Sequence, residues 1–162
     1  MGGWEPYPLA ENRKIPDQLL RTLVAGKDPE GRNPPPWYHR ACLQAFAESS
    51  TSGHINTRYL IDKHTPQSPV AKFLRRVQSV VWERVFFQSQ KEEHFGLGPN
   101  EARRGDLICI LYGCTVPVIL REIEDSVNPY YELIGECYVD GLMDGEATET
   151  EPPPKTMMFK LG

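Results

Sequence analysis

The spacing of apolar residues changes near residue 84, and this change is typical of an α+β fold. Before residue 84, apolar residues recur every three or four positions, as they do on one face of a helix. After it, apolar residues run together or alternate with polar ones, as they do in strands. We therefore expect N-terminal helices followed by a small, barrel-like, mostly antiparallel β-sheet.

Three segments have the helical spacing, and they cover residues 15–25, 36–48 and 70–81. In the first, Pro16 suits the first turn of a helix and Gly26 suits its end. Residues 49–69 are rich in Ser, Thr, Gly and Pro and show no period. This composition predicts a mobile connection without a helix.

The strands expected after residue 84 begin with residues 85–87, Val-Phe-Phe, because β-branched and aromatic residues favour strands. The glycines of residues 96–99 predict a turn. Within residues 106–112, both the odd and the even positions carry apolar residues, which predicts a central strand that is covered on both faces. Residues 116–121 form the next expected strand, and Pro117 places that strand at an edge or at a bulge.

The alternation in residues 130–140 predicts a strand pair with one core face and one solvent-exposed face. Gly135 lies in the middle of this pattern and suggests a sharp bend, by which a short sheet can curl toward a barrel. The expected core face contains Tyr131, Leu133, Gly135, Cys137 and Val139, and the expected exposed face contains Tyr130, Glu132, Ile134, Glu136, Tyr138 and Asp140.

These patterns divide the chain into three expected regions. Residues 1–69 would be helical and rich in loops, residues 70–147 would combine a helix with the barrel-like module, and residues 148–162 would be a flexible tail. The tail, with its three consecutive prolines from Pro152, is expected to have nothing to pack against and therefore to be loose.

Charge and hydropathy exclude several classes of partner. The net charge of −4 gives no general attraction to nucleic acid or to anionic lipid. The basic pairs of residues 75–76 and 103–104 are too small for a phosphate-tracking stripe, and we interpret them as surface charge. No apolar run approaches the roughly 20 residues of a membrane span, and the first residues do not resemble a signal peptide. We expect a cytoplasmic protein that binds neither nucleic acid nor membrane, and whose four cysteines are reduced.

Four motifs occupy the second half of the chain: Gly96-Leu-Gly-Pro99, Arg104-Gly-Asp-Leu-Ile-Cys-Ile-Leu-Tyr-Gly113, Val116-Pro-Val-Ile-Leu-Arg121 and Tyr131-Glu-Leu-Ile-Gly-Glu-Cys-Tyr-Val-Asp-Gly-Leu-Met-Asp-Gly-Glu146. Together they are similar to the closing motifs of fungal heterokaryon-incompatibility (HET-domain) proteins. The segments Arg21-Thr-Leu-Val-Ala25 and Trp37-Tyr-His-Arg-Ala-Cys42 resemble the helical part that precedes these motifs. The resemblance covers roughly residues 18–147.

The resemblance implies a part in non-self recognition, with a protein partner that we expect to be a HET-domain protein. In that family the HET domain drives the cell-death reaction, and nothing in these 162 residues resembles it. The family has no agreed catalytic residues in its C-terminal region, so none is transferred to this chain. The resemblance therefore favours a non-catalytic accessory or recognition module over an enzyme.

Other motifs are better explained by structure than by chemistry. Gly105 between Arg104 and Asp106 suits a turn. His39 and Cys42 stand three residues apart on an expected helix, which supplies only half of a zinc site. We therefore predict no catalytic residue, no cofactor and no metal ion.

The candidate partner-binding surface combines exposed tyrosines with carboxylates, because tyrosine gives rigid contact area at low entropic cost. Its residues are Tyr130, Glu136, Tyr138, Asp144 and Glu146. Two alternatives stay open at this point. The chain could be an enzyme whose carboxylates Glu136, Asp144 and Glu146 converge in a pocket, or a truncated fragment without an independent role.

Overall fold

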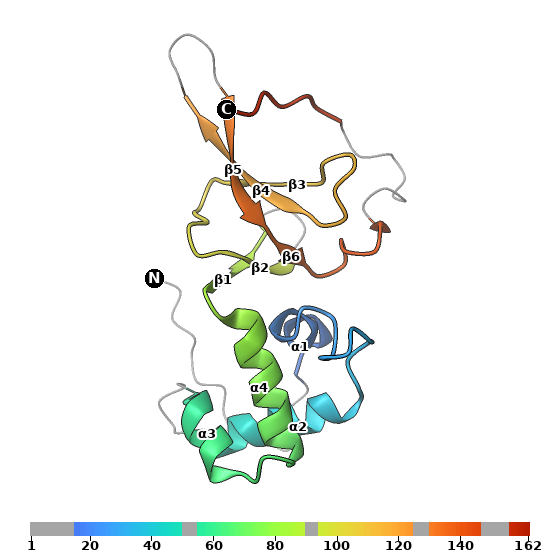
Figure 1. Ribbon diagram of the computed structural model, residues 1–162, viewed down its shortest axis with the longest axis vertical. Helices are drawn as coiled ribbons and strands as arrows, with labels where there is room; N and C mark the ends of the chain where they lie inside the picture. The colour runs from blue at the N-terminus through green and yellow to red at the C-terminus, as the bar shows by residue number, and fades with distance from the viewer. Residues whose placement is uncertain (1–14, 50–54, 90–93, 125–129, 147–155) are drawn as a thin grey trace. The chain divides into compact units, whose positions relative to one another are not determined.

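A computed structural model describes residues 15–49, 55–89, 94–124, 130–146 and 156–162 (Figure 1). Helices come first along the chain and strands follow, which confirms the α+β class. The chain divides into two compact units, Met1–Trp82 and Glu83–Gly162. The helical unit and the sheet unit are each described by themselves.

The helical unit contains the three helices that the periodicity predicted. They are α1 (Asp17–Leu23), α2 (Trp37–Glu48) and α4 (Pro69–Val81). Their apolar stripes meet in one core, because burying such a stripe supplies most of the stability of a short helix. The core residues include Leu20, Val24, Tyr38, Cys42, Leu60, Val70, Phe73 and Leu74.

A fourth helix, α3 (Thr57–Lys63), lies where the sequence suggested an irregular connection. The side chain of Asn56 caps this helix by accepting a hydrogen bond from the Tyr59 amide at 3.0 Å. Leu60 is the buried residue of this short helix. With one buried residue, Leu60, and the partly buried Ile61 beside it, α3 has too little periodicity to be recognised, and the prediction of a helix-free connection was wrong.

Helix α4 belongs to the helical unit, although the sequence patterns had grouped residues 70–81 with the sheet. Ser68 caps α4 by accepting a hydrogen bond from the Ala71 amide at 3.2 Å, and Pro69 occupies the first turn. The buried face of α4 packs into the core of the other helices, and the ring of Phe73 lies 5.3 Å from the ring of Tyr38. The boundary between the two units therefore follows this helix and lies after Trp82.

The sheet unit contains two three-stranded antiparallel sheets. The first has the order β1-β2-β6 and the second the order β3-β4-β5. Their strands are β1 (Arg84–Gln88), β2 (Phe95–Pro99), β3 (Leu107–Cys109), β4 (Val118–Ile123), β5 (Tyr130–Glu136) and β6 (Tyr138–Val139).

One bent strand joins the two sheets, because β6 follows β5 directly after Cys137 (Figure 1). Gly135 has φ +150°, and its partner Ile119 stands where the register of β4 and β5 shifts. This geometry agrees with the bend predicted at Gly135. Among the described residues the sheets do not close into a barrel, and Ile119, Cys137 and Val139 form their core.

Two strand predictions were wrong in ways that matter for the site. The segment of residues 106–112 is not a central strand. Only β3 forms there, at the edge of its sheet, and Leu107 and Ile110 are 38% and 42% exposed. The glycines at 96 and 98 lie inside β2 instead of in a turn. A Cβ atom at Gly96 would overlap the ring of Phe87, so this strand needs glycine for packing.

Part of the expected loose tail is ordered against β5. The amide of Tyr131 donates to the Lys160 carbonyl at 2.8 Å, and the Gly162 amide donates to the Tyr131 carbonyl at 3.2 Å. The ring of Phe159 lies 4.9 Å from the ring of Tyr131. Aromatic packing and strand-like pairing therefore hold residues 159–162, whereas residues 147–155 lie outside the described part of the chain.

Candidate functional site

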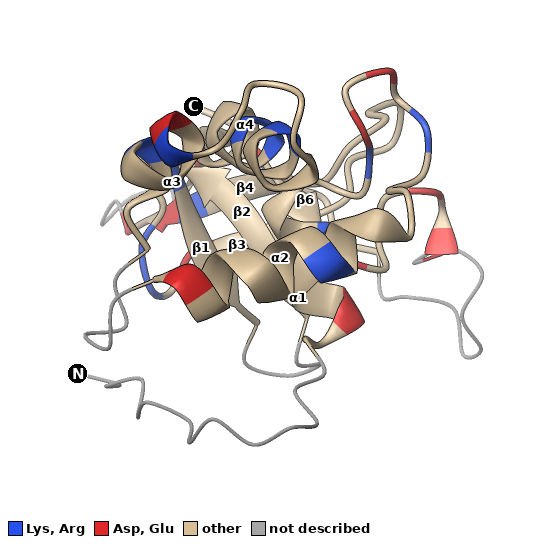
Figure 2. Ribbon diagram, turned by 90° about the horizontal axis from the view of Figure 1, so that it is seen from below, with Lys and Arg blue, Asp and Glu red and all other residues tan. Residues whose placement is uncertain are grey.

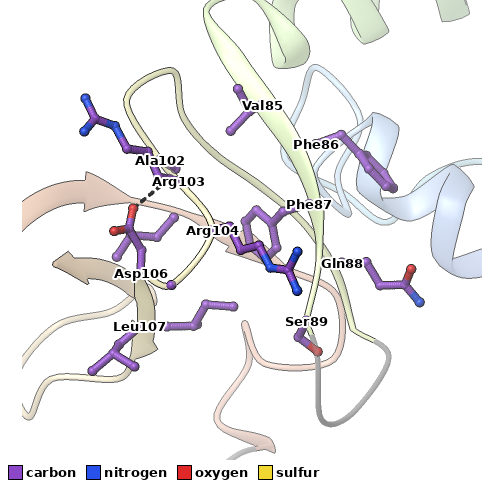
Figure 3. A pocket seen from close by; sticks show the side chains of 13 residues that line it. Val85, Phe86, Phe87, Gln88, Ser89, Ala102, Arg103, Arg104, Asp106 and Leu107 are labelled. Atoms are coloured by element: carbon purple, nitrogen blue, oxygen red, sulfur yellow. Dashed lines mark hydrogen bonds between the residues drawn. The ribbon is translucent and has the colours of Figure 1, made fainter. Parts of the chain in front are cut away.

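A groove of about 750 Å³ opens within the sheet unit (Figure 3). One wall is β1 with the following Ser89, and the other is the loop that leads into β3. The lining residues are Val85, Phe86, Phe87, Gln88, Ser89, Ala102, Arg103, Arg104, Gly105, Asp106, Leu107, Ile108 and Ile119.

The floor of the groove is apolar and belongs to the core of the sheet unit. Phe87, Ala102 and Ile108 pack against the buried cluster that contains Ile119. Phe87 can lie there because the facing residue Gly96 has no side chain. An apolar surface that is open to solvent at the core of a small domain is the usual character of a binding site.

A partly buried ion pair fixes the loop that forms one wall. The Arg121 side chain donates from Nε to Oδ1 of Asp106 and from NH2 to Oδ2, both at 2.8 Å. The backbone amide of Arg103 donates to the same Oδ2 at 2.7 Å. The Arg121 guanidinium, through these hydrogen bonds, holds the pKa of Asp106 below its usual value. Asp106 is therefore a structural carboxylate that stays ionised.

Two arginines, Arg103 and Arg104, stand on the same loop. The side chains of Arg103 and Arg104 make no hydrogen bond or ion pair in the described part of the chain, and both residues are exposed. Figure 3 shows the Arg104 side chain reaching toward β1. Gly105 has φ +101°, which confirms the predicted turn at this position. Both residues line this wall of the groove, but the Arg104 guanidinium reaches toward β1 whereas the Arg103 guanidinium points away from it (Figure 3).

The predicted partner-binding surface is not a single exposed patch. Tyr138 is only 7% exposed, and its hydroxyl donates to Oδ1 of Asp140 at 3.0 Å. The prediction of an exposed Tyr138 was therefore wrong. The alternation of buried and exposed side chains stops here because the chain leaves one sheet for the other after Glu136. Residues 137–140 are all buried. Tyr130, by contrast, is partly buried in β5.

The three carboxylates of the enzyme alternative are exposed. The Asp144 amide donates to Oε2 of Glu146 at 2.7 Å, which closes a local turn. No hydrogen bond or ion pair among the described residues joins Glu136 to either of them. Within the described ranges, no group of three His, Cys, Asp or Glu residues is arranged to hold a metal ion.

His39 and Cys42 have structural surroundings. The Nε2 atom of His39 lies 2.7 Å from Oδ1 of Asp17, so this contact joins α2 to α1. Cys42 is buried in the helical core, where desolvation raises its thiol pKa to about 12. A thiol in this environment is a poor metal ligand, because the thiolate is the binding form.

Little in the sequence indicated the groove. It is formed by segments about twenty residues apart, and Arg103 and Arg104 had been interpreted as surface charge. The presence of charged residues does not by itself identify the groove, because charged side chains occur elsewhere too. On α3, for example, basic and acidic positions lie next to each other (Figure 2). The signal that could have identified the groove is the placement of two basic residues shortly before the apolar run of β3.

The fold and the groove describe an α+β protein whose open antiparallel β-module carries an apolar site with a basic rim. The model of the Het-6 beta-barrel domain matches residues 41–157, so the chain belongs to the Het-6 β-barrel domain family. The described strands form this module as two sheets without closing the barrel.

The chain is also similar to heterokaryon incompatibility protein 6, OR allele, of Neurospora crassa, with 35% identity over 57 residues. This match covers 35% of the chain and only 8% of that protein. No solved structure matches the chain. In the part of the chain that the structure describes, no helix is long and apolar enough to cross a membrane.

Proposed function

We propose that this chain is a non-catalytic recognition module of a heterokaryon-incompatibility protein, which acts in the cytoplasm by binding a protein partner. The observation that carries this proposal is the groove of the sheet unit, with its apolar floor and its two arginines. Membership in the Het-6 β-barrel domain family and the similarity to heterokaryon incompatibility protein 6 support the biological setting.

The chemistry of the groove favours recognition over catalysis. Asp106 is the only carboxylate among the described residues that line it. Its two oxygens accept three hydrogen bonds from Arg121 and Arg103, so it has little capacity left to move a proton. General acid–base catalysis needs a group that changes its protonation state near the working pH. The lowered pKa of Asp106 keeps this carboxylate ionised, so Asp106 does not meet that requirement.

A growth assay in a fungal host tests the proposal. The 162-residue chain is expressed alone and together with a HET-domain protein. We expect normal growth with the chain alone, since binding by itself changes nothing without a partner. With the HET-domain protein, we expect an altered incompatibility response.

Matched variants connect this response to the groove. Replacing both rim arginines (R103E and R104E) should abolish the altered response, whereas the control Arg40→Glu, on an exposed position of α2, should preserve it. Lethality of the chain alone that is lost in Glu136→Gln, Asp144→Asn or Glu146→Gln would overturn the proposal in favour of an enzyme. An altered response that persists in the arginine variant would show that recognition does not use the groove.

A further inference from the structure

The described strands of the sheet unit form one continuous series with two free edges. Because β6 continues β5, the order runs from β1 through β2 and the bent strand to β4 and β3. Among the described residues, β1 pairs only with β2, and β3 pairs only with β4. A strand edge with unpaired amide and carbonyl groups is a template for another strand.

Both free edges border the groove. The Ser89 amide donates to the His94 carbonyl at 2.8 Å, so Ser89 faces β2. Since hydrogen-bonding direction alternates along an antiparallel strand, Phe86 and Gln88 direct their backbone groups outward. Figure 3 shows the side chains of Phe86 and Gln88 on the opposite side of β1 from Val85 and Phe87. Phe86 and Gln88 therefore contribute backbone to the groove, and Phe87 contributes its ring.

The strand directions are compatible with one more antiparallel strand. Each neighbouring pair in the series is antiparallel. With β5 and β6 counted as one bent strand, β1 and β3 stand at the two ends of an odd series and run the same way. Direct pairing between them would be parallel, whereas an inserted strand that runs opposite to both would make every pair antiparallel.

The charge of the groove determines which kind of strand it would attract. Arg103 and Arg104 are exposed, and Asp106, the only carboxylate among the described residues that line the groove, is already neutralised by Arg121. The groove is therefore positive, although the whole chain has a net charge of −4. A ligand with carboxylates would be attracted to the rim, and a basic ligand would be repelled.

We propose that the groove binds an extended acidic segment of a partner protein, which adds as a strand between β1 and β3. This inference rests on the proposed recognition function and names the chemistry of the partner. Apolar side chains on one face of the segment pack on Phe87, Ile108 and Ile119. Carboxylates lie within reach of Arg104, and main-chain hydrogen bonds supply the rest of the affinity, as in other cases of strand addition.

Peptide binding to the full chain tests this inference. The probe is a fluorescein-labelled octapeptide of alternating glutamate and valine, and binding is measured by fluorescence anisotropy. Two matched peptides accompany it, one with lysine in place of glutamate and one with the same sequence but N-methylated at alternate amides. We expect saturable binding of the glutamate peptide, and at least about tenfold weaker binding of both other peptides.

Protein variants locate the site. Arg104→Glu should weaken binding by about tenfold, and Arg40→Glu, with the same change of net charge, should not weaken it. Both residues are exposed and have no described side-chain partner, so both variants should fold. Hydrogen exchange at the Phe86 and Gln88 amides should slow when the peptide binds, whereas Val85 and Phe87, whose amides already face β2, should change less.

The possible outcomes separate this inference from the proposed function. Equal binding of the N-methylated peptide, or unchanged exchange at Phe86 and Gln88, would overturn strand addition. Equal binding of the lysine peptide would overturn the acidic preference. If no peptide binds while R103E and R104E still abolish the co-expression response, the recognition function stands and the extended acidic ligand is wrong.

Discussion

Asp106 and Arg121 form a two-point ion pair in which both oxygen–nitrogen distances are 2.8 Å. Asp106 ends the loop that precedes β3, and Arg121 lies in β4, the centre of its sheet. The same guanidinium donates to the Glu101 carbonyl at 2.8 Å. One arginine therefore holds both ends of the loop that carries Arg103 and Arg104, and this loop forms a preorganised wall of the groove.

Asp106→Asn should destabilise the protein, because an amide cannot replace two charge-assisted hydrogen bonds to the guanidinium. The side chain of Asp106 is only 7% exposed, and we expect a loss of about 1.5–3 kcal/mol in the free energy of unfolding. Urea denaturation measures this loss. Glu136→Gln, at an exposed position without a described ion pair, is the control and should change stability by about 0.5 kcal/mol or less. Equal stability of the two variants would contradict a structural role for Asp106.

Acid should weaken the helical unit through Glu48. This carboxylate accepts hydrogen bonds from Lys63 at 2.7 Å, Gln44 at 2.9 Å and His64 at 3.0 Å, and the pKa falls from 4.5 to about 2. A lowered pKa means that the fold favours the ionised form. The resulting stability is present above about pH 4.5 and is lost as the pH falls toward 2.

The measurement for Glu48 is the melting temperature of the wild type and of Glu48→Gln between pH 2 and pH 6. The wild type should be more stable at pH 6, and the difference should shrink as the pH decreases. Ser79→Ala, at an exposed position of α4 and without a titratable side chain, should keep a constant difference from the wild type. A difference for Glu48→Gln that does not depend on pH would contradict the assignment.

Gly135→Val should destabilise the sheet unit more than Glu132→Ala. At φ +150°, Gly135 has a backbone conformation that side chains with a Cβ rarely adopt, and a Cβ there would lie 2.8 Å from Cγ of Pro99. Such strain costs about 1–3 kcal/mol, whereas removing the exposed Glu132 carboxylate costs about 0.5 kcal/mol or less. Thermal unfolding compares the two variants, and similar melting temperatures would argue against a bend that requires glycine.

Thiol labelling at pH 8 should distinguish the four cysteines. Desolvation raises the pKa of Cys42 and Cys137 to about 12, and it also raises the pKa of the partly buried Cys109. Cys114 is exposed and should react first with iodoacetamide, because the thiolate is the reactive form. Mass spectrometry of partially labelled protein identifies the sites. Labelling of Cys137 as early as Cys114 would show that the sheet core opens readily.

The amino-acid sequence by itself determined the elements with strong local periodicity. The helices that bury Leu20, Tyr38 and Phe73 were predictable because residues three or four apart form one apolar stripe wherever the helix packs. The turn at Gly105 and the bend at Gly135 were predictable because glycine adopts backbone conformations that other residues avoid.

Only the tertiary structure decided which strands lie at the edges and which side chains form the groove. The apolar run after Asp106 looked like a central strand, because local alternation does not reveal how many neighbours a strand has. Tyr138 became buried because the chain changes sheets just before it. Arg104 lines the groove because folding brings its loop beside β1, and this arrangement depends on packing between segments that are not neighbours in the sequence.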